Sequence, residues 1–399
     1  MTQETLDERR CSYCDRRKPP SEFNLEHIWP DALGGDALPE PWVTRKVCAR
    51  CNELSGRYVD GEFIKSWFIS HERSNAAREY LDVSRQHETW LPLSYMGVLA
   101  HPELRNDETA EVWLGPCGDH IVHIRPRQEP VWDVYAGGKP TRKRSDWGSA
   151  FMALCSEEAF WIWTALNSFH RHFRRAHRYM LNSDTPHGFT PSFSDLNEDD
   201  PEQARLATIA RSMETTRKAG NMVKLTTAVR VDLSGRFLTK VAMGIGREIL
   251  GDAFLDTTYA GNLRAALWEP DLEKRQALPV RGSGFFGELG ELPGMGFLRW
   301  NGAWVLWLKP LGSTLALIVV TPSGRSMTIQ VSDDQELVNQ WAQTAPEGLI
   351  FVTAAAVGEA VGPLDGAEFL AHQLGNFVHP ELDRLAKLRK GGAAIPACR

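Results

Sequence analysis

The chain has 399 residues, 42% of them hydrophobic and 24% charged, a balance typical of a folded globular protein that excludes a fibre or wholesale disorder. Its 45 basic and 51 acidic residues give a formal charge of −6, so any nucleic-acid partner must be met by a local basic patch. No apolar run approaches the roughly 20 residues that span a bilayer, and the polar N-terminus lacks a secretory signal pattern. These features predict a cytoplasmic protein with no membrane contact.

Four of the seven cysteines form two CxxC pairs near the N-terminus, Cys11/Cys14 and Cys48/Cys51. In a reducing compartment this spacing indicates metal binding rather than a disulfide. Four thiolates from two tight turns suit a tetrahedral structural zinc ion. The pairs are separated by 33 residues, more than a plain zinc ribbon needs, so a further element is inserted between them. Taken alone, the cysteines favour a structural zinc site in a binding module.

Hydrophobic periodicity and turn residues predict the remaining elements. Asp60 is expected to cap the first of the helices. In chain order, the pattern predicts a helix over 60–82, short strands between 90 and 151, a helix over 156–181, a turn-rich acidic linker over 182–202, a strand over 222–233, a helix over 236–250 that ends at Gly251, strands over 297–300, 303–308 and 314–320, a helix over 334–343 and a final strand over 348–354.

This pattern predicts an α+β protein in three parts. Residues 1–60 form a zinc-stapled domain, residues 61–185 a helix plus a β-rich segment with a basic helix, and residues 200–399 a C-terminal α+β domain. The C-terminal domain is a candidate for sensing a ligand or binding a protein partner.

The insert between the cysteine pairs contains Glu26-His27-Ile28-Trp29-Pro30 and Gly34-Gly35, and the second pair runs directly into Asn52. The pattern CxxC…EHIxPxxLGG…CxxCN resembles the zinc-containing, four-cysteine branch of the HNH endonucleases, the ββα-metal nucleases. The resemblance covers about 50 residues. It implies that Glu26 and His27 lie on the first strand of a β-hairpin and that Asn52 lies on a helix packed across it.

The resemblance also implies a role for each of these residues. His27 would be the general base that takes a proton from the attacking water. Glu26 and Asn52 would be ligands of a catalytic Mg²⁺ or Mn²⁺, although Glu26, next to His27 on a strand, reaches that ion only if the strand bends. Cys11, Cys14, Cys48 and Cys51 would hold a structural Zn²⁺.

One position departs from the family pattern. The middle Asn, which ordinarily orients the base histidine, should fall near Val43. Thr44 or a backbone carbonyl is therefore expected to orient His27 instead.

The segment from 121 to 180 holds ten basic and five acidic residues, a local excess of positive charge. Arg171, Arg174, Arg175 and Arg178 recur at three- and four-residue spacing, which places them on one face of the expected helix. Together with Arg142, Lys143 and Arg144 they are predicted to contact phosphates. The alternative is a solvated face paired with the acidic residues 194–204.

The sequence therefore predicts an HNH endonuclease that hydrolyses DNA, with RNA as the alternative substrate. By analogy of architecture, such a fusion is expected to act in bacterial phage defence. The alternative is a non-catalytic, zinc-stabilised module that binds nucleic acid.

Overall fold

The computed structural model describes residues 8–85, 88–136, 138–139, 147–182, 193–284 and 295–390. Contacts within the chain divide it into two units: the first combines Met1–Ile64 with Arg230–Arg389, and the second combines Lys65–Val229 with the C-terminal end of the chain. The N-terminal and C-terminal segments thus share one unit, whereas the sequence suggested three consecutive parts. As expected, the fold is a mixture of helices and strands with a zinc-type N-terminal domain.

The N-terminal part of the first unit is a small ββα arrangement. Its elements are β1 (Arg9–Arg10), β2 (Arg17–Lys18), β3 (Phe23–His27), β4 (Val43–Cys48), α1 (Ala49–Ser55) and α2 (Gly61–Ile64), with 3₁₀ turns at Pro20–Glu22, Asp31–Leu33 and Gly35–Ala37 and a π-helical turn at Gly56–Asp60. The helical path is continuous from α1 through the π turn into α2. The prediction that Asp60 caps a helix is therefore wrong, because Asp60 lies inside this path.

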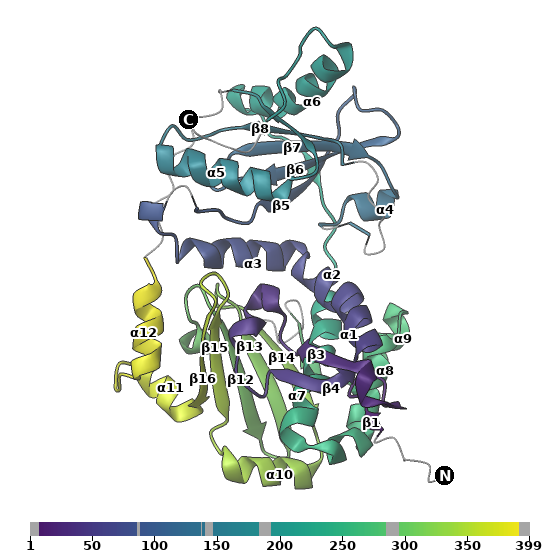
Figure 1. Ribbon diagram of the computed structural model, residues 1–399, viewed down its shortest axis with the longest axis vertical. Coiled ribbons are helices and arrows are strands. Elements are labelled where there is room, and N and C mark those ends of the chain that lie inside the picture. The colour runs from purple at the N-terminus through teal and green to yellow at the C-terminus, as the bar shows by residue number, and fades with distance from the viewer. Residues whose placement is uncertain are drawn as a thin grey trace. The chain divides into compact units, whose positions relative to one another are not determined.

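The rest of the first unit is a six-stranded antiparallel sheet with helices. Its strands are ordered β11-β14-β13-β12-β15-β16 (Figure 1). The elements are α7 (Leu233–Leu250), a 3₁₀ turn at Asp252–Asp256, α8 (Thr258–Trp268), α9 (Leu272–Gln276), β11 (Gly282–Ser283), a 3₁₀ turn at Met295–Leu298, β12 (Trp304–Leu311), β13 (Thr314–Val320), β14 (Ser326–Ser332), α10 (Gln335–Thr344), β15 (Leu349–Ala354), β16 (Glu359–Asp365), α11 (Gly366–Gln373) and α12 (Pro380–Leu388). Helix α7 packs against β14 and α8, so it lies at the centre of this unit.

Most of the predicted C-terminal elements are confirmed, including the helix that ends at Gly251, a residue with φ of +77°. Two strands are wrong. Residues 297 and 298 belong to the 3₁₀ turn Met295–Leu298 and residues 299 and 300 form no strand, and only Leu225–Thr226 of the stretch 222–233 is a strand. The strand predicted over 348–354 is β15, but it is not the last strand, because β16 follows it along the chain.

The second unit has its own six-stranded sheet, ordered β10-β5-β6-β7-β8-β9. Its elements are α3 (Trp67–Arg78), a 3₁₀ turn at Val83–Arg85, β5 (Ser94–Leu99), β6 (Glu108–Leu114), β7 (His120–Pro126), α4 (Pro130–Asp133), β8 (Ser149–Ala153), α5 (Ala159–His172), β9 (His177–Met180), α6 (Pro201–Lys218) and β10 (Leu225–Thr226). All neighbouring strands are antiparallel except β8 and β9. The predicted strands between 90 and 151 are confirmed.

The predicted helix over 156–181 is wrong in its last third. Helix α5 ends at His172, and β9 pairs in parallel with β8. Tyr179 of β9 stacks on Phe151 of β8 with ring centroids 4.9 Å apart. This long-range packing overrides the local helical spacing of the arginines, which a sequence pattern alone cannot reveal. Part of the predicted linker, residues 183–192, lies outside the described residues.

Aromatic contacts embed the N-terminal segment in the core of the first unit. Trp29 is fully buried, and its ring lies 5.4 Å from Phe237 of α7 and 5.5 Å from Trp304 of β12. Gly34, with φ of +91°, accepts a hydrogen bond through its carbonyl from Thr353 of β15, and a Cβ atom there would lie 2.2 Å from that hydroxyl oxygen. Only glycine fits this position. The ββα segment and the large sheet therefore share one hydrophobic core.

The chain leaves the first unit after Ile64 and returns to it at Arg230. The two crossing points are held by an ion pair in which Arg230 Nη1 lies 3.0 Å from Glu62 Oε2. Within the described part of the chain, no helix combines the length and apolar character that crossing a membrane requires.

Candidate functional site

The hairpin of β3 and β4 carries the candidate site, and α1 packs against both strands. In the antiparallel register, Glu26 lies opposite Thr44 and His27 lies opposite Val43. A register shift between Asn24 and Glu26 bulges β3 at Leu25. This arrangement of a hairpin and a crossing helix is the one that the sequence predicted for residues 11–60.

The four predicted cysteines come together beside this hairpin. Cys11 and Cys14 lie in the turn between β1 and β2, Cys48 ends β4, and Cys51 lies in α1. Their sulfur atoms all lie within 4.8 Å of one another. Four sulfurs bound to one zinc ion at about 2.3 Å would be about 3.8 Å apart, so the cluster fits a tetrahedral zinc site.

Contacts among the cysteines favour a single thiolate, at Cys11, in the absence of a metal ion. The hydrogen bond from Cys51 lowers the pKa of Cys11 to about 4 and raises the pKa of Cys51 well above its usual range. The backbone N–H of Cys48 also donates to Cys11 Sγ, at 3.3 Å. Burial raises the pKa of Cys14. A zinc ion would supply the positive charge that four neighbouring thiolates require.

His27 ends β3, and its side chain is about a quarter exposed. Its Nδ1 lies 2.5 Å from Oδ1 of Asp31, which begins the 3₁₀ turn after the strand. Thr44, which was expected to orient His27, instead donates its hydroxyl to Glu248 of α7 at 2.5 Å. Asp31, rather than Thr44, therefore contacts the His27 ring. Because a carboxylate accepts the Nδ1 proton, Nε2 is left free to act as a base.

Glu26 points to the opposite face of the strand and is only 3% exposed. Its Oε1 lies 2.7 Å from Nζ of Lys240, a fully buried residue of α7, and accepts a hydrogen bond of 3.1 Å from the Tyr13 hydroxyl. Burial and the Glu26 carboxylate raise the pKa of Tyr13 well above its usual range. Asp60 also contacts Lys240, at 3.1 Å, and burial raises the pKa of Asp60 to about 6.

Asn52 lies in the second turn of α1, as predicted. Its side-chain Nδ2 donates to the Leu25 carbonyl at 2.8 Å and to Asn24 Oδ1 at 3.1 Å. These bonds tie α1 to the bulge of β3 and hold the helix beside the strand that ends in His27. The structure therefore brings Asn52 to the hairpin, whereas Glu26 and His27 face opposite sides of it.

The predicted Mg²⁺ or Mn²⁺ site does not fit these contacts. Glu26 already has a lysine as its counter-charge, and its carboxylate is buried away from the His27 ring. Asn52 contributes one amide oxygen, which alone is too few ligands for a hard divalent cation. The assignment of Glu26 and Asn52 as cation ligands stays a prediction that the geometry does not support.

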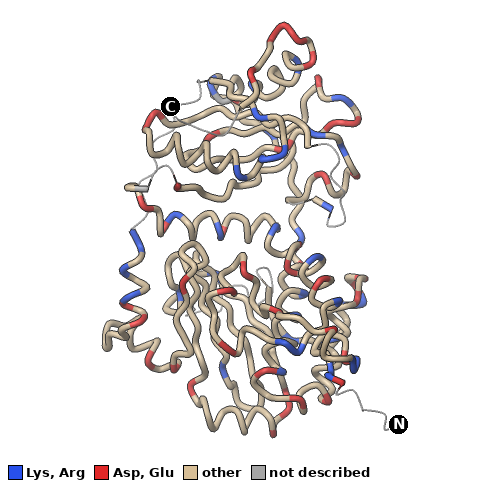
Figure 2. The backbone as a smooth tube through the Cα atoms, viewed as in Figure 1, with Lys and Arg blue, Asp and Glu red and all other residues tan. Residues whose placement is uncertain are grey.

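A basic ribbon of strands β1 and β2 adjoins the hairpin, and blue Lys and Arg positions gather around it and β4 (Figure 2). Arg9 lies opposite Lys18, and Arg10 opposite Arg17, so each cross-strand pair repeats a positive charge. One member of each pair already has an acidic partner, because Arg10 pairs with Asp15 and Asp256 and Lys18 pairs with Glu22. Arg9, Arg17 and Arg45 are exposed and form no ion pair with any described residue. This surface, hereafter the arginine ribbon, suits a polyanion.

The predicted arginines of the second unit do not share one helix face. Arg171 lies in α5 with its guanidinium 4.9 Å from the Trp90 ring centroid, and Arg178 lies in β9 beside His170. Arg174 and Arg175 follow the helix, in the turn between these elements. Their role in binding nucleic acid stays a prediction. Arg142, Lys143 and Arg144 lie outside the described residues.

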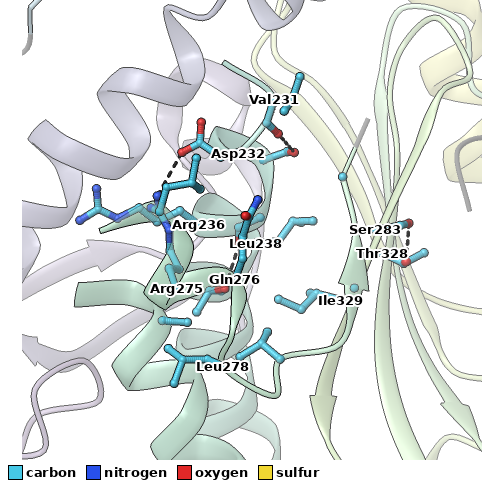
Figure 3. A pocket seen from close by; sticks show the side chains of 18 residues that line it. Val231, Asp232, Arg236, Leu238, Arg275, Gln276, Leu278, Ser283, Thr328 and Ile329 are labelled. Atoms are coloured by element: carbon cyan, nitrogen blue, oxygen red, sulfur yellow. Dashed lines mark hydrogen bonds and ion pairs between the residues drawn. The ribbon is translucent and has the colours of Figure 1, made fainter. Parts of the chain in front are cut away.

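A cavity of about 320 Å³ lies in the C-terminal part of the first unit, between α7, α9 and β14 (Figure 3). Its polar side holds the ion pair of Asp232 and Arg275, 3.1 Å apart. Nothing in its contacts assigns a ligand to it, so the expected ligand or partner of the C-terminal region has no further support.

Comparison with known proteins agrees with the ββα geometry. The family model described as HNH endonuclease matches residues 11–68, a stretch that includes the four cysteines, His27 and Asn52. No curated protein and no solved structure matches the chain. The N-terminal segment is therefore an HNH domain of the nuclease type.

Three features of the site were missed from the sequence. Asp31 follows His27 by four residues, so it could have been found only if the strand was known to end at His27. The like-charged pairs of the arginine ribbon become visible only once the register of β1 and β2 is known. Lys240 lies 213 residues from His27 and has no local signal that connects it to the hairpin.

Proposed function

We propose that this chain is an endonuclease that hydrolyses phosphodiester bonds of DNA, with His27 as the general base. The observation that carries the proposal is the pairing of His27 with Asp31 at the end of an HNH hairpin, on a side chain that solvent can reach. The arginine ribbon beside the hairpin supports a nucleic-acid substrate, because phosphate contacts need local positive charge.

The residues of the chain support one set of steps. The arginine ribbon would hold the phosphate backbone, and a water molecule would lie against Nε2 of His27. His27 would take a proton from that water as it attacks phosphorus, and Asp31 would stabilise the imidazolium that forms. The bond from phosphorus to the 3′ oxygen would break in the same step, and that oxygen would take a proton from solvent water. The zinc ion would act only by fixing the hairpin and α1. A role in phage defence, by analogy of architecture, and a cytoplasmic location complete the proposal.

The contacts of Glu26 favour a second candidate, a zinc-stabilised module that binds nucleic acid without cutting it. In this reading, His27 and Asp31 are a surface ion pair. This reading is supported by the ion pair between the buried Lys240 and Glu26, the residue whose counterpart in the family binds the catalytic cation.

Cleavage of supercoiled plasmid in Mg²⁺ or Mn²⁺ separates the two candidates. We expect the natural chain to nick the plasmid and His27→Ala to be slower by about 10²–10⁴-fold, the usual contribution of a general base. Zinc content and DNA affinity should stay unchanged, and His101→Ala, in the second unit, serves as the matched control. DNA binding without nicking by the natural chain would favour the binding module.

A further inference from the structure

Lys240 is a fully buried lysine in the middle of α7, and its ammonium lies among four oxygen atoms. Nζ is 2.7 Å from Glu26 Oε1, 3.1 Å from Asp60 Oδ2, and 3.1 Å from each of the backbone carbonyl oxygens of His27 and Ile28. Burial opposes the charge, but Asp60 and Glu26 outweigh it, so the pKa of Lys240 is raised. The lysine is therefore charged.

This set of oxygens resembles a cation site rather than an ordinary salt bridge. Two carboxylates and two carbonyls are the ligand types that hard divalent cations prefer. The ammonium has three protons for four nearby oxygens. One of the Asp60 oxygens, Oδ1, is buried and has no hydrogen-bond partner among the described residues. The group thus carries one negative charge more than its lysine neutralises.

Two positive charges cannot share this space. A divalent cation bound to Glu26 would lie within about 3–4 Å of the Lys240 ammonium in a buried setting, where the repulsion between like charges is strong. Either Glu26 binds a cation and Lys240 moves away, or Lys240 remains and Glu26 binds none. Lys240 is packed inside a helix at the core of the unit, which favours the second arrangement.

We propose that the Lys240 ammonium permanently takes the place of a metal ion at Glu26 and Asp60, and that Glu26 is therefore not a cation ligand in this protein. Lys240 also holds the backbone of His27 and Ile28 through their carbonyls. It is thus a positioning residue for the proposed base, supplied by a helix more than 200 residues further along the chain. This inference deepens the proposed function and rests on it for the role of His27.

The first test compares Mn²⁺ binding and thermal unfolding between the natural chain and Glu26→Gln, without DNA. We expect Mn²⁺ affinity to be the same in both, including no binding by either, and the melting temperature to fall because Lys240 loses a counter-charge. Loss of a metal ligand should instead weaken Mn²⁺ binding by about tenfold or more. That result, with an unchanged melting temperature in metal-free buffer, would overturn the proposal.

The second test removes the ammonium. Lys240→Ala leaves Glu26, Asp60 and two carbonyls around a space that a cation can enter. We expect this variant to melt at a lower temperature than the natural chain and to recover part of the loss in millimolar Mn²⁺, and we expect Glu26→Gln added to it to abolish the recovery. Lys46→Ala, which removes a partly exposed lysine paired with Glu248, is the matched control and should show no Mn²⁺ effect.

An unaltered melting temperature for Lys240→Ala, or an equal Mn²⁺ effect on the natural chain, would contradict the proposal. If Lys240→Ala gives no folded protein with or without Mn²⁺, the Glu26→Gln comparison decides alone. None of these readouts depends on DNA cleavage. An inactive natural chain would thus refute the proposed nuclease while leaving the lysine–carboxylate assignment standing. A natural chain that cuts DNA but fails the Mn²⁺ and melting tests would refute the assignment while leaving the nuclease standing.

Discussion

Asp31 gives His27 the partner that a base histidine needs. The carboxylate lies next to Nδ1, so the proton is fixed there and Nε2 is kept available. The same pair of residues could be read from the sequence only after the strand was known to end at His27, because a strand that continued would have carried Asp31 away from the ring.

Asp31→Asn tests this contact directly. An amide can still accept a hydrogen bond from Nδ1–H but no longer stabilises the imidazolium, so we expect plasmid cleavage to slow by about 10–100-fold, the usual effect of removing a histidine's orienting partner. Zinc content should be unchanged. Asp36→Asn, an exposed carboxylate in the next turn, is the control, and equal rates for Asp31→Asn and the natural chain would remove Asp31 from the site.

Asp60 makes the stability of the protein depend on pH. Burial raises its pKa from 3.8 to about 6, against the favourable charge of Lys240 and with the unfavourable charges of Glu26 and Asp31. The folded state therefore binds a proton more tightly than the unfolded state, and the free energy of unfolding falls as the pH rises from about 4 to about 6. The full difference corresponds to at most about 3 kcal/mol.

Unfolding of Asp60→Asn by denaturant at a series of pH values checks this sign. We expect the natural chain to lose stability relative to the variant between about pH 4 and pH 6 and to run parallel to it above that range. The exposed Asp333→Asn should show no such change. A natural chain that gains stability relative to Asp60→Asn as the pH rises over this range would contradict the raised pKa of Asp60.

At the scale of single residues, a contact could be predicted from the sequence when its two partners lie close together along the chain. The cysteine cluster and the placement of His27 and Asn52 were predictable because short motifs with local geometry create them. Lys240, Glu248 and Thr353 contact the hairpin from segments more than 200 residues away, and a sequence pattern carries no record of such pairings. The burial of Glu26 could therefore not be foreseen.

At the scale of elements, the arginine ribbon is the feature with a functional consequence. Its exposed Arg9 and Arg17 form no ion pair with any described residue, so they are the charges that a bound polyanion would contact. The β1–β2 turn also carries the first zinc pair, so metal binding and the shape of this charged surface are linked.

The salt dependence of DNA binding tests the ribbon. Replacement of Arg9 and Arg17 by Ala should weaken binding to all sequences alike and flatten the slope of log K against log salt by about 0.9 for each lost phosphate contact on duplex DNA. The same measurement on Arg174→Ala with Arg178→Ala tests the predicted surface of the second unit. A slope unchanged by either double substitution would remove that surface from the interface.

Elements themselves were predictable where local pattern and tertiary packing agreed. The strand over 314–320 and the helix that ends at Gly251 have both an apolar pattern and local stop signals. The helix over 156–181 failed because His177–Met180 joins a parallel pair with β8, and that pairing outweighs the spacing of the arginines.

At the scale of the whole molecule, zinc should stabilise far more than the segment that binds it. Trp29 packs between α7 and β12, so loss of the hairpin would open the core of the first unit. An independent 60-residue domain would unfold alone, whereas a shared core unfolds as one cooperative unit.

Hydrogen exchange before and after zinc is stripped by a chelator distinguishes these outcomes. We expect amides of α7 and β12 to lose protection together with the hairpin, while strands β6 and β7 of the second unit keep theirs. Cys117→Ser, a buried thiol of the second unit, should leave the zinc content unchanged. Loss of protection confined to residues 8–60, or an absence of zinc in the purified protein, would contradict the shared core.

The ion pair between Glu62 and Arg230 has a consequence for how the segment between them is inserted into the first unit. It joins the two points where the chain leaves the first unit and re-enters it, so residues 65–229 form an insertion whose ends are neighbours. Adjacent ends are the condition under which one module can be exchanged for another without disturbing its host. The first unit is thus interrupted by an insertion whose two ends lie side by side, a junction at which an exchanged or circularly permuted segment would leave the host contacts in place.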